Sequence, residues 1–210
     1  MPSFTTAPLQ PWGLRSTVLT LDQSLFEAIN AGPATPLFLI ALARWVSVTL
    51  PLLVGAALAL WCARGTREHR RVIAKTLVAM AVTWVGVHLL RWGVPAPRPA
   101  QLGLGIQWLE HGARAGFPSM HAAQAFALAT SLALCRIPRW AGVAFLGATA
   151  IAWSRVFLGV HFPLDVLAGA TTGILAAGAT GWLVTQAPLS WQRRFSAYSS
   201  HPARPWARRR

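Results

Sequence analysis

The chain has 210 residues, of which 54% are hydrophobic and only 11% are charged, whereas a soluble domain usually carries about a quarter charged residues. Its formal net charge is +14. The arginines lie between apolar runs rather than along one polar face, which argues against nucleic acid as a partner. The length allows one domain, and the long apolar runs favour a membrane protein over a soluble protein with a large helical core.

Residues 1–35 lack the basic start, apolar centre and small-residue cleavage site of a signal peptide. Within them, the amphipathic stretch Leu21–Ile29 predicts a helix that lies along the membrane surface. We therefore interpret residues 1–35 as an N-terminal interfacial segment and residues 36–186 as a membrane domain. Residues 187–210 contain six arginines and are interpreted as a basic cytoplasmic tail.

Five apolar runs organise the rest of the chain, and a bilayer-crossing helix needs about 20 residues, with a range down to about 17. The runs are Pro36–Cys62, Val72–Leu90, Ala122–Cys135, Trp140–Val156 and Leu164–Val184. The first is overlong and contains Arg44 and Pro51, so we expect an interfacial stretch followed by a span near Val46–Cys62. The third is short, and we expect its helix to extend over Ser119–Ile137. The predicted fold is all-α: a polytopic membrane bundle of about five transmembrane helices plus an N-terminal interfacial helix.

Basic residues in short loops mark the cytoplasmic side of a membrane protein. With five spans, twelve arginines fall on one side and five on the other. The twelve are Arg64, Arg67, Arg70, Arg71, Arg136, Arg139, Arg193, Arg194, Arg204, Arg208, Arg209 and Arg210; the five are Arg15, Arg91, Arg98, Arg114 and Arg155. This bias predicts that the N-terminus lies outside and the tail inside.

The loops on the outer side hold three polar segments. They are RWGVPAPRP with Arg91 and Arg98, FPSMH with Ser119 and His121, and SRVFLGVHFPLD with Arg155, His161 and Asp165. His121 and Arg155 are 34 residues apart, which corresponds to two membrane crossings of about 17 residues each. That spacing returns the chain to the same face, so the three segments can converge.

The convergent residues suit phosphate chemistry. Arginine forks match phosphate oxygens, and helices that begin near Ser119 and Pro163 would direct free amides and positive dipole ends at the same anion. His161 and Asp165 are four residues apart, so on a helix they share a face. A carboxylate beside an imidazole fixes its tautomer and leaves the other nitrogen to attack, and His121 can act as the general acid. Any one arginine or histidine alone is more often structural, so the inference depends on the joint pattern.

These residues resemble the type 2 phosphatidic acid phosphatases, a family that shares a fold with the vanadium haloperoxidases. That family shows K-x-x-x-x-x-x-R-P, then P-S-G-H, then S-R-x-x-x-x-x-H-x-x-x-D. The third motif is complete here as Ser154, Arg155, His161 and Asp165, the second reads Pro118, Ser119, Met120 and His121, and the first reads Arg91, Arg98 and Pro99. The motifs and their spans cover about Val72–Val184.

Two positions depart from the family pattern. Arg91 replaces the opening lysine, which keeps the charge but changes reach and geometry. Met120 replaces the glycine of the second motif, at a position where the family uses a backbone N–H to bind phosphate; methionine keeps that N–H but adds bulk. Both departures leave the choice of substrate more open than the type of reaction.

The resemblance implies a role for each motif residue. His161 would be the nucleophile that forms a phosphohistidine, Asp165 its orienting partner and His121 the acid for the leaving group. The phosphate would be held by Arg91, Arg98, Ser119, Met120 and Arg155. The family needs no metal, and we expect no cofactor; the expected partners are a lipid phosphate and membrane lipids.

The small five-span form with an interfacial helix resembles bacterial undecaprenyl-diphosphate phosphatases. It implies conversion of undecaprenyl diphosphate to undecaprenyl phosphate in the bacterial inner membrane, with the active site facing the periplasm or outside. Phosphatidylglycerophosphate, phosphatidic acid and lipid A phosphatases stay open as alternatives, as does transfer of the phosphoryl group to another lipid. A non-enzymatic anion or lipid transporter is the alternative from a different class.

Overall fold

The computed structural model describes residues 13–110 and 115–186, and all the regular structure in these ranges is helical. The helices are α1 (Gly13–Ile29), α2 (Leu37–Arg44), the π-turn η1 (Trp45–Thr49), α3 (Leu50–Arg64), α4 (Arg67–Gly93), the short 3₁₀ helix η2 (Pro99–Leu102), α5 (Met120–Leu134), α6 (Pro138–Phe157) and α7 (Pro163–Gln186). The predicted all-α helix bundle is therefore confirmed.

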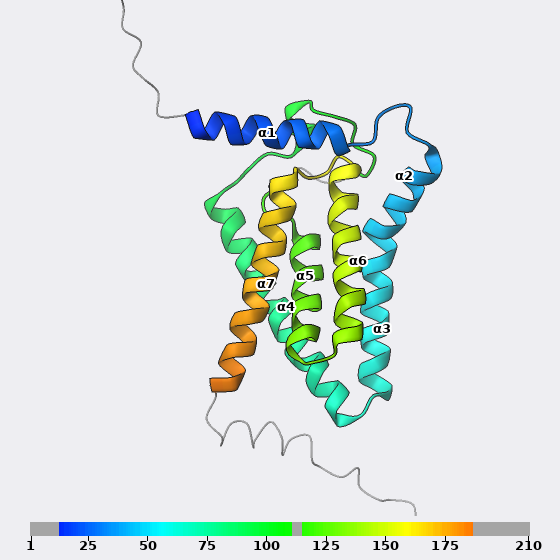
Figure 1. Cartoon of the computed structure of the whole chain (residues 1–210), viewed down its shortest axis with the longest axis vertical. Helices are drawn as coiled ribbons and strands as arrows, with labels where there is room; N and C mark the ends of the chain where they lie inside the picture. The colour runs from blue at the N-terminus through cyan, green and yellow to red at the C-terminus, as the bar shows by residue number, and fades with distance from the viewer. Residues whose placement is uncertain (1–12, 111–114, 187–210) are drawn as a thin grey trace, which may run out of the picture.

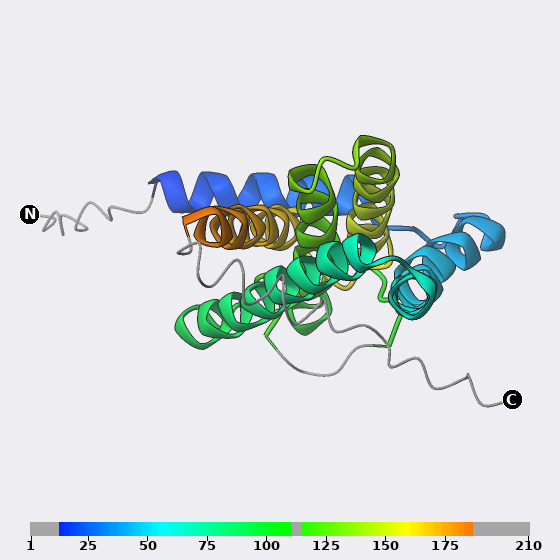
Figure 2. The same cartoon turned by 90° about the horizontal axis from the view of Figure 1, so that it is seen from below.

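The bundle is arranged around α5, which packs against α4, α6 and α7 (Figure 1). Helix α1 runs crosswise over the end of the bundle where α6 and α7 meet, as both views show (Figures 1 and 2). The turns from α3 to α4 and from α5 to α6 lie at the opposite end (Figure 1). The predicted surface helix is thus present, and it begins at Gly13 rather than near Leu21.

The chain is a multi-pass membrane protein. Within residues 13–110 and 115–186, four helical stretches are long and apolar enough to cross a bilayer: Leu37–Arg64, Arg67–Gly93, Pro138–Phe157 and Pro163–Val184. The fifth bundle helix, α5, has only 15 residues. Because α4, α6 and α7 surround it, α5 meets protein rather than lipid along much of its surface and needs less length than a lipid-facing helix.

The first apolar run is helical from Leu37 onward, and the expectation of an interfacial stretch followed by a span near Val46–Cys62 stays a prediction. Helices α2 and α3 continue through η1, in which the Leu50 N–H donates to the Trp45 carbonyl five residues before it. Pro51 follows immediately, and a proline inside an α-helix removes a hydrogen bond and crowds the preceding turn. The wider π-turn accommodates the proline ring and the missing hydrogen bond, so the helix bends and continues. Arg44, at the end of α2, donates from Nε to the Trp108 carbonyl at 2.8 Å.

The expected extension of the third helix to Ile137 is wrong. Helix α5 ends at Leu134, and Arg136 has a positive φ of 58°. The Ile137 N–H then reaches back to the Leu132 carbonyl, at 3.1 Å, as in a helix-terminating turn. Pro138 opens α6 directly afterwards, and the residue before a proline is disfavoured in the helical region.

Two glycines let α7 approach α5 closely. A Cβ on Gly169 would collide with the Ser119 carbonyl, and one on Gly173 would collide with the Ala123 carbonyl. These contacts align the N-terminal ends of α5 and α7 at the end of the bundle that α1 covers (Figure 1). The basic tail, residues 187–210, lies outside the described residues, so the proposed domain boundaries stay predictions.

Candidate active site

The three polar segments converge at the end of the bundle beneath α1, as their spacing predicts. Arg91 lies in the last turn of α4, Arg98 precedes η2, and Arg155 lies in the last turn of α6. His161 and Asp165 flank the start of α7. Three of these side chains are almost fully buried: Arg98 is 4% exposed, and Arg155 and His161 are each 1% exposed.

The imidazole of His161 lies between a carboxylate and a guanidinium. Its Nδ1 is 3.3 Å from Asp165 Oδ2, which also accepts the Phe162 N–H at 2.9 Å. If Nδ1 carries the proton toward the carboxylate, Nε2 has a lone pair. That Nε2 lies 3.3 Å from NH1 of Arg98. An anion drawn to Arg98 would therefore meet the nucleophilic nitrogen.

Arg98 is held in place by backbone acceptors. Its NH1 donates to the Val160 carbonyl at 2.7 Å and its NH2 to the Ala115 carbonyl at 3.4 Å. Burial lowers the pKa of Arg98, the nearby Arg91 charge lowers it further, and the Asp165 carboxylate opposes both. An arginine stays protonated in spite of such shifts, so the pocket contains a fixed positive charge.

The other two arginines are oriented by partners on different segments. Arg155 NH1 donates to Ser47 Oγ at 2.6 Å, and Ser47 is buried within the π-turn η1. Arg91 NH2 donates to the Pro118 carbonyl at 3.0 Å, directly before Ser119. Sequence reasoning missed Ser47, because its partner is 108 residues away and no motif marks the serine.

Ser119 occupies the predicted N-cap position of α5, but its side chain makes no capping bond. Its Oγ is buried and has no hydrogen-bond partner among the described residues, and a buried hydroxyl normally has one. The Ser119 N–H donates to the Asp165 carbonyl at 2.9 Å, which ties the start of α5 to the start of α7. The hydroxyl is therefore available to a ligand oxygen.

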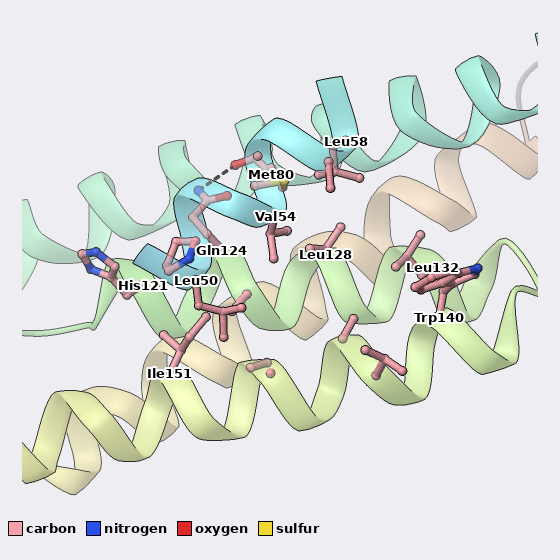
Figure 3. Close-up of a pocket in the computed structure, with 18 of the residues that line it drawn as sticks. Leu50, Val54, Leu58, Met80, His121, Gln124, Leu128, Leu132, Trp140 and Ile151 are labelled. Carbon is pink, nitrogen blue, oxygen red and sulfur yellow. Dashed lines mark hydrogen bonds between the residues drawn. The ribbon is translucent and has the colours of Figure 1, made fainter. Parts of the chain in front are cut away.

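His121 and Met120 lie in the first turn of α5 and line a cavity of about 950 Å³. The cavity extends between α3, α5 and α6, and Figure 3 shows His121 near one end of it. His121 is half-buried and lies two residues after Ser119 at the start of α5, at the end of the cavity nearest the candidate site.

Asp22 of α1 is a second residue that sequence reasoning missed. Its Oδ1 accepts the Leu164 N–H at 2.9 Å and so caps α7 from a position 142 residues earlier. Burial raises the pKa of the Asp22 carboxyl, the Leu164 hydrogen bond opposes this, and the Asp165 charge adds to the rise. The crosswise helix is thereby anchored to the helix that carries Asp165.

The electrostatic balance of the site favours an anion. Among the described residues, three guanidinium groups gather here against the carboxylates of Asp165 and Asp22, and two helix N-termini add their positive dipole ends. Planar arginine forks bind phosphate oxygens. No group of three or more His, Cys, Asp or Glu side chains that could hold a metal occurs in the described part of the chain. His111 and Arg114, which lie between η2 and α5 in the sequence, are not among the described residues.

Comparisons with known proteins agree with this chemistry. Residues 73–188 match the PAP2 superfamily. The chain is 37% identical over 180 residues to YbjG of Escherichia coli (strain K12), provisionally named an undecaprenyl-diphosphatase, covering 82% of this chain and 83% of that protein. It is 42% identical over 69 residues to the lipid A 4′-phosphatase of Bacteroides thetaiotaomicron, covering 32% of this chain and 29% of that protein.

Two solved structures have a similar fold. LpxE of Aquifex aeolicus superposes with a TM-score of 0.66 at 27% identity, over 76% of this chain and 94% of LpxE. The PAP2-type phosphatidylglycerolphosphate phosphatase of Bacillus subtilis superposes with a TM-score of 0.62 at 20% identity, over 82% of this chain and 88% of the phosphatase. At 20% identity, the similarity to the Bacillus subtilis phosphatase supports a shared fold only.

We predict that Ser47→Ala weakens anion binding, because the buried Arg155 guanidinium loses an acceptor that orients it. An unsatisfied buried partner costs about 1–3 kcal/mol, so the Kd for inorganic phosphate should rise about tenfold or more. The measurement is the phosphate-dependent rise in thermal midpoint of the detergent-solubilised protein. Ser131→Ala is the control, since Ser131 is buried in α5 and its Oγ has no partner among the described residues. Equal phosphate responses in both variants would contradict the assigned role of Ser47.

Proposed function

The chain belongs to the PAP2 superfamily, and from this membership we propose that it hydrolyses a polyprenyl diphosphate, undecaprenyl diphosphate to undecaprenyl phosphate, at the candidate active site. It is a multi-pass membrane phosphatase that acts on lipid phosphates, as are its relatives. The specific lipid, the residue roles and the orientation in the membrane are the proposal.

One observation carries the proposed mechanism: His161 is held by Asp165 on one side and faces Arg98 on the other. The carboxylate orients the imidazole and stabilises the positive charge that develops on it. The guanidinium brings the phosphate to Nε2 of His161 and neutralises the phosphate charge. Positioning and charge stabilisation provide most of the catalysis in phosphoryl transfer.

The reaction proceeds in two steps. In the first step, His161 Nε2 attacks the terminal phosphorus, the bond from that phosphorus to the bridging oxygen breaks, and the lipid monophosphate leaves. His121 protonates the departing oxygen where the leaving group needs a proton. In the second step, water attacks the phosphohistidine, His121 accepts its proton, and inorganic phosphate is released.

The remaining motif residues hold the transferred phosphoryl group. Arg91, Arg98 and Arg155 neutralise its oxygens, and the Ser119 hydroxyl and the Met120 backbone N–H donate hydrogen bonds to it. No metal or cofactor takes part in this scheme, as the resemblance to the family implies.

The relatives support a polyprenyl diphosphate ahead of the other lipids. The match to YbjG extends over most of both chains, whereas the lipid A 4′-phosphatase matches less than a third of each. Phosphatidylglycerophosphate, phosphatidic acid or lipid A as substrate, or phosphotransfer to a second lipid, stays the alternative within the same chemistry. A non-enzymatic transporter does not fit the family.

We also propose that the site faces the periplasm or outside of a bacterial inner membrane. The arginines of the α3–α4 and α5–α6 turns lie at the end of the bundle opposite the site, and cationic loops favour the cytoplasmic side. In this orientation, α1 lies along the outer surface. Its Leu21 and Leu25 side chains are exposed and suit contact with lipid.

The substrate proposal predicts that the purified protein releases phosphate from undecaprenyl diphosphate about tenfold or more faster, by kcat/KM, than from phosphatidylglycerophosphate or phosphatidic acid. EDTA should leave the rate unchanged. Activity that disappears in EDTA and returns with magnesium would contradict the arginine-based mechanism. If phosphatidylglycerophosphate reacts and undecaprenyl diphosphate does not, the lipid assignment alone is wrong.

The role of His121 predicts a dependence on the leaving group. His121→Ala should lose about 10²–10⁴-fold in rate on a lipid monophosphate, because the departing alkoxide then lacks its acid. Because His121 also acts in the second step, the rate to compare is that of the first step, measured in a single turnover as release of the leaving group. This loss should be much smaller with p-nitrophenyl phosphate, whose leaving group needs no proton. His88→Ala is the control, since His88 is exposed and bonds only within its own helix to the Trp84 carbonyl, at 2.9 Å. An equal loss on both substrates would show that His121 is not the acid.

The proposed orientation predicts the outcome of thiol labelling in intact cells, after Cys62 and Cys135 are replaced by alanine. A membrane-impermeant reagent should label Ala100→Cys, at an exposed position within η2, and miss Arg67→Cys at the start of α4. Ala100 is a better position than nearby Gly103, whose φ of 69° disfavours a side chain. The reverse labelling pattern would overturn the orientation.

A further inference from the structure

The cavity beside His121 is lined almost entirely by apolar side chains. It follows α5 from Met120 to Leu132, a distance of about 18 Å at 1.5 Å per residue. Leu50, Val54 and Leu58 of α3 form the opposite wall (Figure 3). No residue of α3 is buried, which fits a helix that stands beside the bundle rather than being packed into it. Protein interiors are normally filled, so a cavity of this size suits an apolar occupant.

The cavity also opens to the side of the bundle. Trp140 and Val143 of α6 line it and are 60% and 59% exposed. In the membrane this surface meets lipid chains, so a substrate could enter sideways from the bilayer without leaving it. His121 lies at one end of the cavity, and Leu132 and Trp140 lie at the other end (Figure 3).

Three side chains narrow the cavity where it meets the active site: Met120, His121 and Gln124. Gln124 Nε2 donates to the Met80 carbonyl at 3.0 Å and lies 3.6 Å from Met120 Sδ. Because the Met80 carbonyl oxygen can only accept a hydrogen bond, the nitrogen of the Gln124 side-chain amide has to face it. Gln124 is thereby held between α5 and α4 next to His121 (Figure 3). We call these three residues the neck.

We propose that the cavity holds the phosphate-proximal part of a single polyprenyl chain, and that Met120 and Gln124 are the residues that exclude diacylglycerol-based phosphates. The inference rests on the proposed function and specifies how the site chooses its lipid. A polyprenyl diphosphate carries one chain directly on its phosphate oxygen. A diacyl lipid branches close to the phosphate into two ester-linked chains, which the neck has to admit together.

The shape of the neck, rather than the affinity of the cavity for a lipid chain, determines which lipid phosphate is accepted. A lipid chain that moves from the bilayer into an apolar groove gains little from the hydrophobic effect, because both surroundings are equally apolar. The groove therefore acts by positioning the phosphate bond at His161 and His121. Met120 distinguishes this chain from the family motif that it resembles, which has glycine at that position. Glycine has no side chain that could contact Gln124.

The first test removes the Met120 side chain. Met120→Gly should raise kcat/KM for phosphatidylglycerophosphate and phosphatidic acid relative to undecaprenyl diphosphate by about tenfold or more, a range that the loss of a few buried carbons produces. Met120→Leu keeps the bulk and should keep the wild-type ratio. A ratio that stays unchanged in Met120→Gly would overturn the role of the neck.

The second test fills the cavity. Gly147 lines it, and a Cβ there would meet nothing within 4 Å, so Gly147→Leu should fold and place its side chain in the space of the lipid chain. We expect a loss of about tenfold or more in kcat/KM for undecaprenyl diphosphate, with p-nitrophenyl phosphate hydrolysis unchanged. Gly142→Leu is the matched control, since Gly142 is on the same helix, is equally unobstructed and lies outside the cavity lining.

The outcomes separate this inference from the proposed function. If no lipid phosphate and no p-nitrophenyl phosphate is hydrolysed, the proposed function fails. If wild-type activity on undecaprenyl diphosphate is as proposed but Gly147→Leu and Gly142→Leu behave alike, the cavity is filled by bulk lipid or a second copy of the chain, and the inference is wrong. Cross-linking through a cysteine at Val143 would identify the second copy.

Discussion

Buried positive charge at one end of the bundle is the constraint on which the rest of the site depends. Arg98 and Arg155 are almost completely enclosed, and an enclosed charge is costly unless other groups compensate it. The Val160 carbonyl and the Ser47 hydroxyl orient these guanidinium groups without cancelling their charge. The pocket therefore stays electrostatically suited to a phosphate, whose negative charge completes it.

The surrounding helices serve the same requirement. Gly169 and Gly173 allow α7 to approach α5, so that two positive helix ends face one pocket. Asp22 ties the crosswise helix α1 to the first turn of α7, next to Asp165, which orients His161. The apolar cavity begins near Met120 and His121, directly after Ser119 at the start of α5. In the proposed function, the charged head and the hydrocarbon chain of the substrate occupy these neighbouring sites.

Local spacing predicted the parts of this arrangement that local physics controls. The four-residue interval placed His161 beside Asp165, and the outer-loop motifs converged because helix length returns the chain to one face. Features set by distant partners were not predictable: Ser47 meets Arg155, and Asp22 meets Leu164, across more than a hundred residues. The π-turn in the first apolar run was not predictable either. Pro51 marks a local conflict in the helix, but the sequence does not show that a π-turn accommodates it.

The central claim is that the imidazole held by Asp165 attacks phosphorus. The most direct measurement uses substrate labelled in its terminal phosphate, a rapid quench without acid to preserve an acid-labile phosphohistidine, and peptide mapping of the trapped protein. The account predicts label on the peptide that contains His161, and neither label nor turnover in His161→Ala. Label on His121, or normal turnover by His161→Ala, would contradict it.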